Sequence, residues 1–138
     1  MTDAPPSIRS RADLEQYLAH FNARRYEQQI AYYAPDVIYK VGNLSLTSPK
    51  QIVEFYADFH QFVKERVELL DIAVDGDTVA AVVHAVFQPM KEYVRNGLHY
   101  KVGTTTDIVS FVFYKLKGGR IHRIRMTRYP GPASDFKA

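Results

Sequence analysis

Residues 66–89 read RVELLDIAVDGDTVAAVVHAVFQP, two runs rich in β-branched residues on either side of Asp75-Gly76. An Asp-Gly pair between two such runs is a strong signal for a β-hairpin, because both residues tolerate the positive φ angles of a tight turn. Two more turn pairs follow, Asn96-Gly97 and Gly118-Gly119. Three hairpin turns imply four antiparallel strands, which we expect over residues 66–74, 77–89, 102–117 and 120–129.

The residues before this meander predict helices. Ser10 offers an N-cap hydroxyl at the start of the first helix. The apolar positions of this helix recur with helical spacing and are Leu14, Tyr17, Leu18 and Phe21. A shorter second helix has to stop near Pro35, because the residue before a proline resists the α conformation. Its apolar residues are Tyr26, Ile30 and Tyr33.

A short strand and a third helix complete the first half of the chain. Residues 37–41 are β-branched and aromatic and predict the strand. Ser48-Pro49 starts the third helix. The apolar residues of this helix are Ile52, Phe55, Tyr56, Phe59 and Val63. Helices followed by a meander are typical of the α+β class, and strands this long need bends, so we predict a curved antiparallel sheet around the helices.

Length and composition indicate one globular domain. The chain has 138 residues, of which 46% are hydrophobic and 24% are charged. We place a single domain at residues 10–130, with a flexible leader at 1–9 and a flexible tail at 131–138. Cysteine is absent, which excludes disulfides and thiol nucleophiles. No segment resembles a signal peptide or a membrane span, so we expect a cytoplasmic protein.

Charge argues against a nucleic-acid ligand. The net charge is +3, and the basic residues near the C-terminus belong to a predicted strand, where alternate side chains point to opposite faces. At most half of them form one patch. The five histidines show no spacing typical of metal ligands, and no glycine-rich phosphate loop is present. We therefore predict no metal, cofactor, nucleic acid or membrane partner.

Alternation along the strands predicts which side chains face the core. On the second long strand the inward set is Val79, Ala81, Val83, Ala85 and Phe87. On the last strand Ile124 and Met126 point inward and bring Arg128 to the same face, while Arg123 and Arg125 point outward. The strand over 102–117 is apolar on both faces. We expect its outer face to form the interface of a homo-oligomer, a dimer or trimer.

Several short segments carry a family resemblance. They are Tyr17 five residues before Asn22, YAPDVIYK (33–40), IVEFY (52–56), VDGDT (74–78) and GGRI (118–121). In this order the chain resembles the nuclear-transport-factor-2-like, or SnoaL-like, superfamily from Ser10 to Tyr129. The resemblance implies a cone-shaped, cystatin-like α+β barrel with an apolar cavity. Ketosteroid isomerases, polyketide cyclases and scytalone dehydratase use this cavity for chemistry, whereas other members only bind ligands.

The resemblance transfers only part of the acid–base machinery. Tyr17 matches a helical tyrosine of several enzyme members, but Asn22 stands where many relatives have aspartate. Tyr39 and its neighbours occupy the region of the ketosteroid isomerase base, so that route of proton transfer is disfavoured. At the start of the next long strand, where dehydratase relatives often carry histidine, the sequence has Lys64, Glu65 and Arg66.

The candidate catalytic residues are tyrosines and arginines. Neutral tyrosine hydroxyls and a guanidinium can stabilise a developing oxyanion, which selects Tyr17, Tyr39, Arg66 and Arg128. Each has a structural alternative, as a core aromatic or a solvated strand-end arginine. His84 and Asp107 form a lower-ranked acid–base candidate on the predicted outer face. The predicted substrate-binding residues are Phe21, Phe55, Phe59, Glu68, Phe87, Ser110, Met126 and Tyr100.

Three further interpretations stay open at this point. Arg66 and Glu68 share a strand face and are either a base with its positioning partner or an ion pair at the rim. His60 lies opposite the apolar stripe of its helix, which indicates a solvated side chain. Residues 90–103 are aromatic enough to cover the cavity as a lid, or form an ordinary hairpin tip.

Two functions are compatible with these observations. The first is a cofactor-independent isomerase, cyclase or lyase/dehydratase that acts by general acid–base catalysis on a hydrophobic, aromatic or polycyclic substrate. The second is a binding or assembly module with the same fold and no chemistry. The ten tyrosines favour the enzyme, and the missing helical aspartate favours the binding module.

Overall fold

In the part of the chain that the structure describes, a six-stranded curved sheet, a small two-stranded sheet and three α-helices make up the fold, which confirms the predicted α+β class. The computed structural model describes residues 6–95 and 98–136. The helices are α1 (Arg11–Asn22), α2 (Tyr26–Ile30) and α3 (Pro49–Phe59). The sheet consists of β1 (Tyr33–Val41), β2 (Leu44–Leu46), β3 (Val63–Asp75), β4 (Thr78–Pro89), β7 (Thr106–Lys117) and β8 (Arg120–Arg128).

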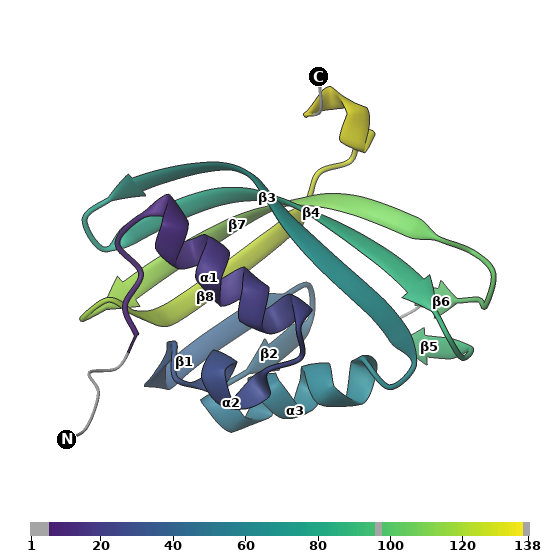
Figure 1. Cartoon of the computed structure of the whole chain (residues 1–138), viewed down its shortest axis with the longest axis horizontal. Coiled ribbons are helices and arrows are strands. Elements are labelled where there is room, and N and C mark those ends of the chain that lie inside the picture. Colours follow the sequence, from purple (N-terminus) through teal and green to yellow (C-terminus); the bar gives the residue numbers. More distant parts are fainter. Residues whose placement is uncertain (1–5, 96–97, 137–138) are drawn as a thin grey trace.

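The strand order in this sheet is β2-β1-β8-β7-β4-β3. Its long strands curve over α1, while α2 and α3 close the lower side (Figure 1). All the pairings are antiparallel except that of β1 with β8, which is parallel. The sheet is therefore mixed rather than purely antiparallel. A parallel pair is available to β1 because most of the chain separates it from β8.

Local capping explains where two helices begin. The Ser10 hydroxyl accepts a hydrogen bond from the Asp13 amide at 3.3 Å, and the Ser48 hydroxyl accepts one from the Gln51 amide at 3.1 Å. Pro49 occupies the first turn of α3, where its missing N–H costs nothing. Helix α3 ends at Phe59, so the expectation that it extends to Val63 is wrong. Val63 instead begins β3.

Helix α2 and the first strand also differ from prediction. Helix α2 ends at Ile30, and Tyr33 belongs to β1, which starts four residues earlier than predicted. The register between β1 and β8 shifts between Tyr33 and Ile38. A strand interrupted in this way escapes detection by simple alternation, because the irregularity breaks the period of two.

The long hairpin predicted at Asn96-Gly97 is only partly built into the main sheet. Strand β4 pairs directly with β7, and the intervening residues form a separate two-stranded sheet of β5 (Tyr93–Arg95) and β6 (Leu98–Tyr100). Asn96-Gly97 itself lies outside the described residues. The small sheet packs its Tyr93 and Tyr100 rings against Phe59, with centroids 5.5 Å apart in both cases.

Both predicted flexible ends include residues that pack on the domain. Ile8, which the sequence analysis placed in the leader, is buried in the core, and its amide donates to the Gly119 carbonyl at 2.8 Å. At the other end, residues Ala133–Asp135 form a 3₁₀ turn, and the Phe136 ring lies 5.9 Å from that of Phe111. The domain therefore extends beyond the predicted boundaries on both sides.

Side chains from α1 and the turn after it cover the free edge of β3. They donate to the backbone carbonyls of alternate β3 residues: Arg11 to Leu69, Asn22 to Val67 and Arg24 to Glu65. An exposed edge strand is prone to pair with another chain, and these bonds satisfy its carbonyl groups. Among the described helices, none is long and apolar enough to cross a membrane.

Candidate functional site

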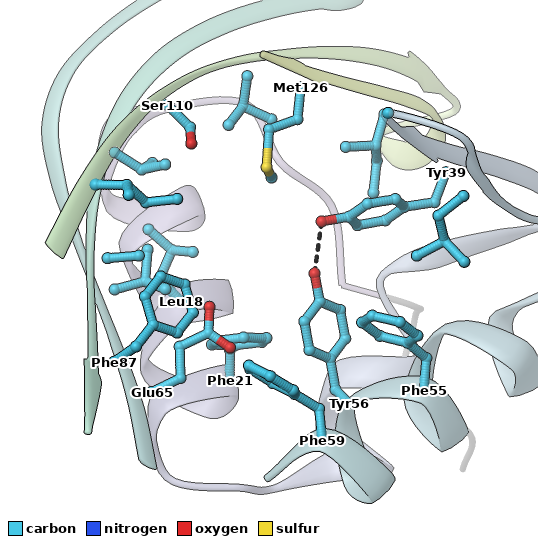
Figure 2. A pocket seen from close by; sticks show the side chains of 18 of the residues that line it. Leu18, Phe21, Tyr39, Phe55, Tyr56, Phe59, Glu65, Phe87, Ser110 and Met126 are labelled. Atoms are coloured by element: carbon cyan, nitrogen blue, oxygen red, sulfur yellow. Dashed lines mark hydrogen bonds between the residues drawn. The ribbon is translucent and has the colours of Figure 1, made fainter. Parts of the chain in front are cut away.

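A cavity of about 530 Å³ lies between the concave face of the sheet and the helices. This volume is typical of pockets for small organic ligands. Most of the lining is aromatic or aliphatic (Figure 2). The aromatic lining residues are Tyr17, Phe21, Tyr39, Phe55, Tyr56, Phe59, Phe87, Tyr100 and Tyr114. The aliphatic and small ones include Leu18, Val67, Val83, Ala85, Ile108, Ser110, Val112, Ile124 and Met126.

The predicted inward faces are confirmed on two strands. The inward set of β4 is buried throughout, and Val83, Ala85 and Phe87 line the cavity. Ile124 and Met126 of β8 line it as well. The structure also decides which face of β7 points into the cavity. Its Ile108, Ser110, Val112 and Tyr114 line the cavity, whereas Phe111 and Phe113 are exposed on the opposite face.

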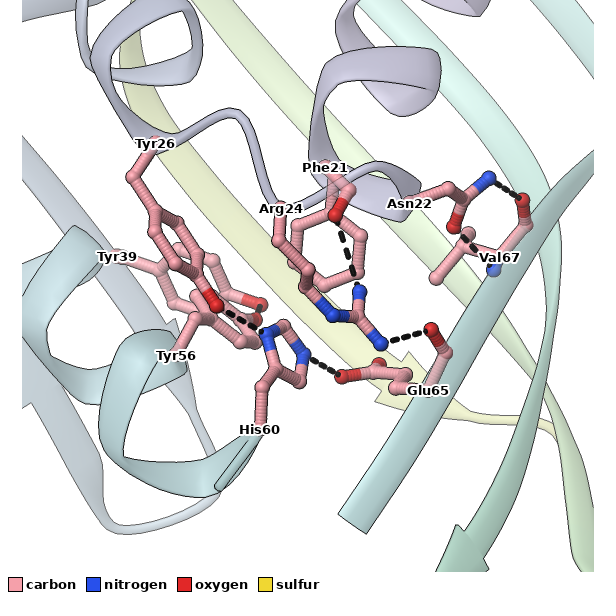
Figure 3. A network of polar contacts seen from close by, with 9 residues as sticks. All are labelled: Phe21, Asn22, Arg24, Tyr26, Tyr39, Tyr56, His60, Glu65 and Val67. Atoms are coloured by element: carbon pink, nitrogen blue, oxygen red, sulfur yellow. Dashed lines mark hydrogen bonds and ion pairs between the residues drawn. The ribbon is translucent and has the colours of Figure 1, made fainter. Parts of the chain in front are cut away.

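Glu65 is the one ionisable carboxyl group among the described lining residues. Its side chain is 9% exposed, and its Oε1 lies 3.0 Å from Nε2 of His60. His60 is the C-cap of α3, and its Nδ1 lies 2.9 Å from the hydroxyl of Tyr26 on α2 (Figure 3). A neutral imidazole fits both contacts if Nε2–H donates to Glu65 and Nδ1 accepts from Tyr26.

Two tyrosine hydroxyls face Glu65 across the cavity. The Tyr39 hydroxyl from β1 and the Tyr56 hydroxyl from α3 lie 2.5 Å apart, and Figure 2 shows both pointing toward the centre of the pocket. One hydroxyl donates to the other, so the second retains a proton for a ligand. Tyr17 makes a similar pair with Tyr33 at 2.7 Å.

Burial keeps these tyrosines protonated. Removal from water disfavours the phenolate, and it is the main reason why the pKa of Tyr17 and of Tyr56 lies well above the usual value. Burial also raises the pKa of Tyr33 to about 12 and that of Tyr39 above its usual value. The negative charge of Glu65 adds to the effect on Tyr39 and Tyr56. Both hydroxyls are therefore neutral donors near pH 7.

The position of Glu65 is set by contacts to its own strand. Asn22 at the end of α1 makes two hydrogen bonds of 2.8 Å with the backbone N–H and carbonyl of Val67, two residues from Glu65 (Figure 3). Arg24 donates to the Glu65 carbonyl at 2.6 Å and to that of Phe21 at 3.0 Å. Arg24 has φ of 60°, an unfavourable conformation for a residue with a side chain. We infer that its two hydrogen bonds offset this strain.

Most of the predicted site residues lie around the cavity. Of the predicted catalytic residues, Tyr17 and Tyr39 line it. The predicted substrate-binding residues that line it are Phe21, Phe55, Phe59, Phe87, Ser110, Met126 and Tyr100. The structure thus brings together predicted residues from two helices, α1 and α3, from four strands of the main sheet and from the small β5–β6 sheet. Their chemical roles stay predictions.

Arg66 and Glu68 lie outside this group. Both are exposed on the outer face of β3, because β3 begins at Val63 and its inward residues are Val63, Glu65 and Val67. A change of one position exchanges the two faces of a strand, so the expectation that Arg66 and Glu68 face the cavity is wrong. Arg128 is exposed as well and does not line the cavity. Its charge acts to lower the pKa of Tyr100, but burial is the larger effect and the pKa of Tyr100 is raised.

Sequence reasoning missed Glu65, His60 and Tyr56. His60 was expected to be solvated, but its side chain is only 3% exposed. The expectation assumed that α3 continues beyond His60. The helix ends at Phe59, so helical spacing does not predict the direction of the His60 side chain. A usable signal was present, because Glu65 alternates with Lys64 and Arg66 and so shares the parity of Val63, Val67 and Leu69.

His84 and Asp107 do pair, with Nε2 of His84 2.9 Å from a carboxylate oxygen of Asp107. Neither residue lines the cavity, so they lie on the outer face as predicted from alternation. Among the described residues, no group of three histidines or acids is arranged to hold a metal ion. The chemistry of the cavity therefore has to be derived from Glu65, the tyrosines and the residues behind them.

A family model described as a SnoaL-like domain matches residues 14–124. The chain belongs to this SnoaL-like family. The match covers most of the chain and agrees with the resemblance found in the short segments. No protein of curated function matches the sequence.

Solved structures share the fold of this SnoaL-like chain. A protein of Pseudomonas putida assigned as a polyketide cyclase is 23% identical, with a TM-score of 0.68 over 90% of this chain and 92% of that one. A Silicibacter protein with the same assignment is 22% identical, with a TM-score of 0.70 over 88% of both chains. A Kribbella flavida protein assigned as a ketosteroid isomerase is 19% identical, with a TM-score of 0.65 over 93% and 86%. At these identities the likeness establishes the fold, which is one that small-molecule enzymes use.

Proposed function

We propose that this SnoaL-like chain is a cofactor-independent enzyme that removes a proton next to a carbonyl group of a hydrophobic, aromatic or polycyclic substrate. One observation carries the proposal: the Glu65 carboxylate faces a pair of neutral tyrosine hydroxyls across an apolar cavity (Figure 2). A base and an oxyanion donor on opposite sides of a bound ligand are the two groups that enolisation needs.

Glu65 takes the role of general base. His60 donates to Oε1, and among the described residues no other side chain donates to this carboxylate. The second oxygen is then available for a substrate C–H, and the packed imidazole holds the carboxylate in position. The Glu65 side chain is only 9% exposed, so little water competes with a bound substrate for this oxygen.

The hydroxyl pair of Tyr39 and Tyr56 takes the role of oxyanion donor. When a proton leaves the carbon next to the carbonyl, negative charge develops on the carbonyl oxygen. A preorganised hydroxyl stabilises this charge more than water does, because it needs no reorientation during the reaction. The enolate then accepts a proton at another carbon, attacks a second carbonyl or expels a leaving group. These routes correspond to isomerisation, cyclisation and elimination.

The experiment that tests the function follows exchange of 2-tetralone, a bicyclic ketone with acidic C–H groups, in D₂O. Deuterium incorporation next to the carbonyl, measured by NMR with and without protein, reports enolisation without knowledge of the natural substrate. We expect protein-dependent exchange that stops when a hydrophobic phenol such as 2-naphthol occupies the cavity. Binding of 2-tetralone without any exchange would favour the non-catalytic alternative. That alternative is supported by the presence of only one ionisable acid, Glu65, among the described lining residues.

We further propose that the outer face of the sheet forms a homo-oligomer interface. Phe111 and Phe113 are 41% and 46% exposed there. They lie beside Arg125 and Asp71 around a shallow hollow, so a two-fold pairing would bring opposite charges to the rim of an apolar contact.

Phe113→Glu is expected to shift the protein toward the monomer, since a charge at the centre of such an interface costs about 2 kcal/mol or more of association free energy. Sedimentation velocity measures the change. Val94→Glu is the matched control, because Val94 is exposed on β5, away from this face. A monomeric wild-type protein would contradict the interface, and so would a Phe113→Glu variant that associates like wild type.

A further inference from the structure

We propose that the cavity binds hydrophobic organic cations, such as aromatic amines in their protonated form, with the positive charge held next to Glu65. The inference deepens the proposed function and rests on it in one respect, since both need an ionised Glu65 inside the cavity. It names a class of ligand that occupies the site and competes with the substrate for the base.

The charges around the cavity are unbalanced. Of the described lining residues, Glu65 is acidic and none is lysine, arginine or histidine. His60 contacts the carboxylate from behind the lining and is itself held by Tyr26, so on the cavity side Glu65 meets no basic side chain of the described lining. A buried charge without a counter-ion is costly, so a cationic ligand gains more here than in water.

The nearest arginines do not remove this imbalance. The guanidinium of Arg24 donates to the backbone carbonyls of Phe21 and Glu65, and it lies over the Phe21 ring at 5.9 Å from the centroid. Arg24 does not line the cavity, and neither does the exposed Arg128. Arg24 is held by the two backbone carbonyls. Arg128 lies opposite Ser110 in the β7–β8 pairing and is exposed, so water screens its charge more than that of the buried Glu65.

Aromatic rings surround the carboxylate on the cavity side. Phe87 is the direct neighbour of Glu65 across the β3–β4 pairing, and its ring lies 6.0 Å from Phe59 and 5.8 Å from Tyr100. The charge of Glu65 raises the pKa of Tyr100, second to burial, which places that hydroxyl within its field. Phe21 completes the group on the side of α1 (Figure 2).

This combination suits an ammonium group. The faces of aromatic rings carry partial negative charge and attract cations, and the attraction grows when water is excluded. An ammonium N–H can also donate to the free oxygen of Glu65 in a charge-assisted hydrogen bond. The hydrocarbon part of the same ligand fills the apolar remainder of the cavity. A carboxylate or phosphate placed next to Glu65 is repelled by its charge.

The test compares ligands that share one frame and differ in charge. Isothermal titration calorimetry measures binding of 2-naphthylmethylamine, 2-naphthylmethanol and 2-naphthoate to the wild-type protein at pH 7. We expect the amine to bind at least about tenfold more tightly than the alcohol, and the carboxylate not to bind. In Glu65→Gln the preference for the amine disappears, whereas Arg66→Gln, which changes the exposed neighbour on the same strand, retains it.

A second pair of ligands needs no variant. (2-Naphthylmethyl)trimethylammonium and 2-neopentylnaphthalene have the same shape, and only the first carries a charge. Tighter binding of the ammonium ion by wild type supports the proposal even if Glu65→Gln fails to fold. Equal affinities in both ligand comparisons would overturn it, as would an amine preference that persists in a folded Glu65→Gln protein.

The outcome is separable from that of the proposed function. If Glu65→Gln loses the amine preference but keeps 2-tetralone exchange, the cation site stands and Glu65 is not the base. If Glu65→Gln loses exchange while wild type binds amine and alcohol equally, the base assignment stands and the cation site is wrong.

Discussion

Glu65→Gln is expected to lower the protein-dependent exchange of 2-tetralone by about 100-fold to 10,000-fold, the usual contribution of a general base. Glutamine has the same shape, and its carbonyl oxygen can still accept the hydrogen bond from His60. The amide cannot take up a proton near pH 7, so the variant removes the chemistry and preserves the packing. Exchange rates from NMR in D₂O give the comparison.

The matched control for this prediction is Arg66→Gln. Arg66 follows Glu65 on the same strand but is exposed on the outer face, so its replacement leaves the cavity unchanged. Near-UV circular dichroism of both variants checks that the tyrosine environments persist. An unchanged exchange rate in a folded Glu65→Gln variant would rule out Glu65 as the base and direct attention to Tyr39 and Tyr56.

Asn22→Asp is expected to destabilise the fold by about 2–3 kcal/mol at pH 7, because a carboxylate cannot donate to the Val67 carbonyl. In the wild type the Asn22 amide donates to this carbonyl and accepts from the Val67 amide, both at 2.8 Å. An ionised aspartate would place a negative oxygen against the carbonyl oxygen. The Asn22 amide thus ties α1 to β3.

The pH dependence of Asn22→Asp gives a further check. Repulsion from the carbonyl raises the pKa of the introduced carboxyl in the folded state above its unfolded value of about 3.9. The protonated acid can donate to the Val67 carbonyl, so stability is regained at low pH and is lost as pH rises above 3.9 through the folded-state pKa. Urea unfolding at pH 7 and below pH 4, each relative to wild type, measures this difference.

Gln28→Glu is the control for Asn22→Asp. Gln28 is exposed on α2, so the same amide-to-carboxylate change there should alter stability little. If both variants lose the same stability at pH 7, the effect comes from net charge and the pair of hydrogen bonds has little weight. A loss confined to Asn22→Asp would show that this contact holds the strand that carries Glu65.

Local signals were sufficient for much of the fold. The Asp75-Gly76 and Gly118-Gly119 turns separate the strands as expected, and Gly76, Gly118 and Gly119 all have positive φ. The Ser10 and Ser48 caps begin their helices where predicted. These features depend on neighbouring residues alone, because turn conformation and helix capping involve contacts within a few positions.

The sequence therefore determined the fold class, the turns and the aromatic character of the cavity, since side chains that alternate along one strand share a face wherever the strand lies. Only the tertiary structure decided which acid enters the cavity. Helix α3 stops at Phe59, β3 starts at Val63, and this register turns Glu65 inward and Arg66 outward. His60 meets Tyr26 across 34 positions of the chain. Such long-range pairings arise from packing, which no local period encodes.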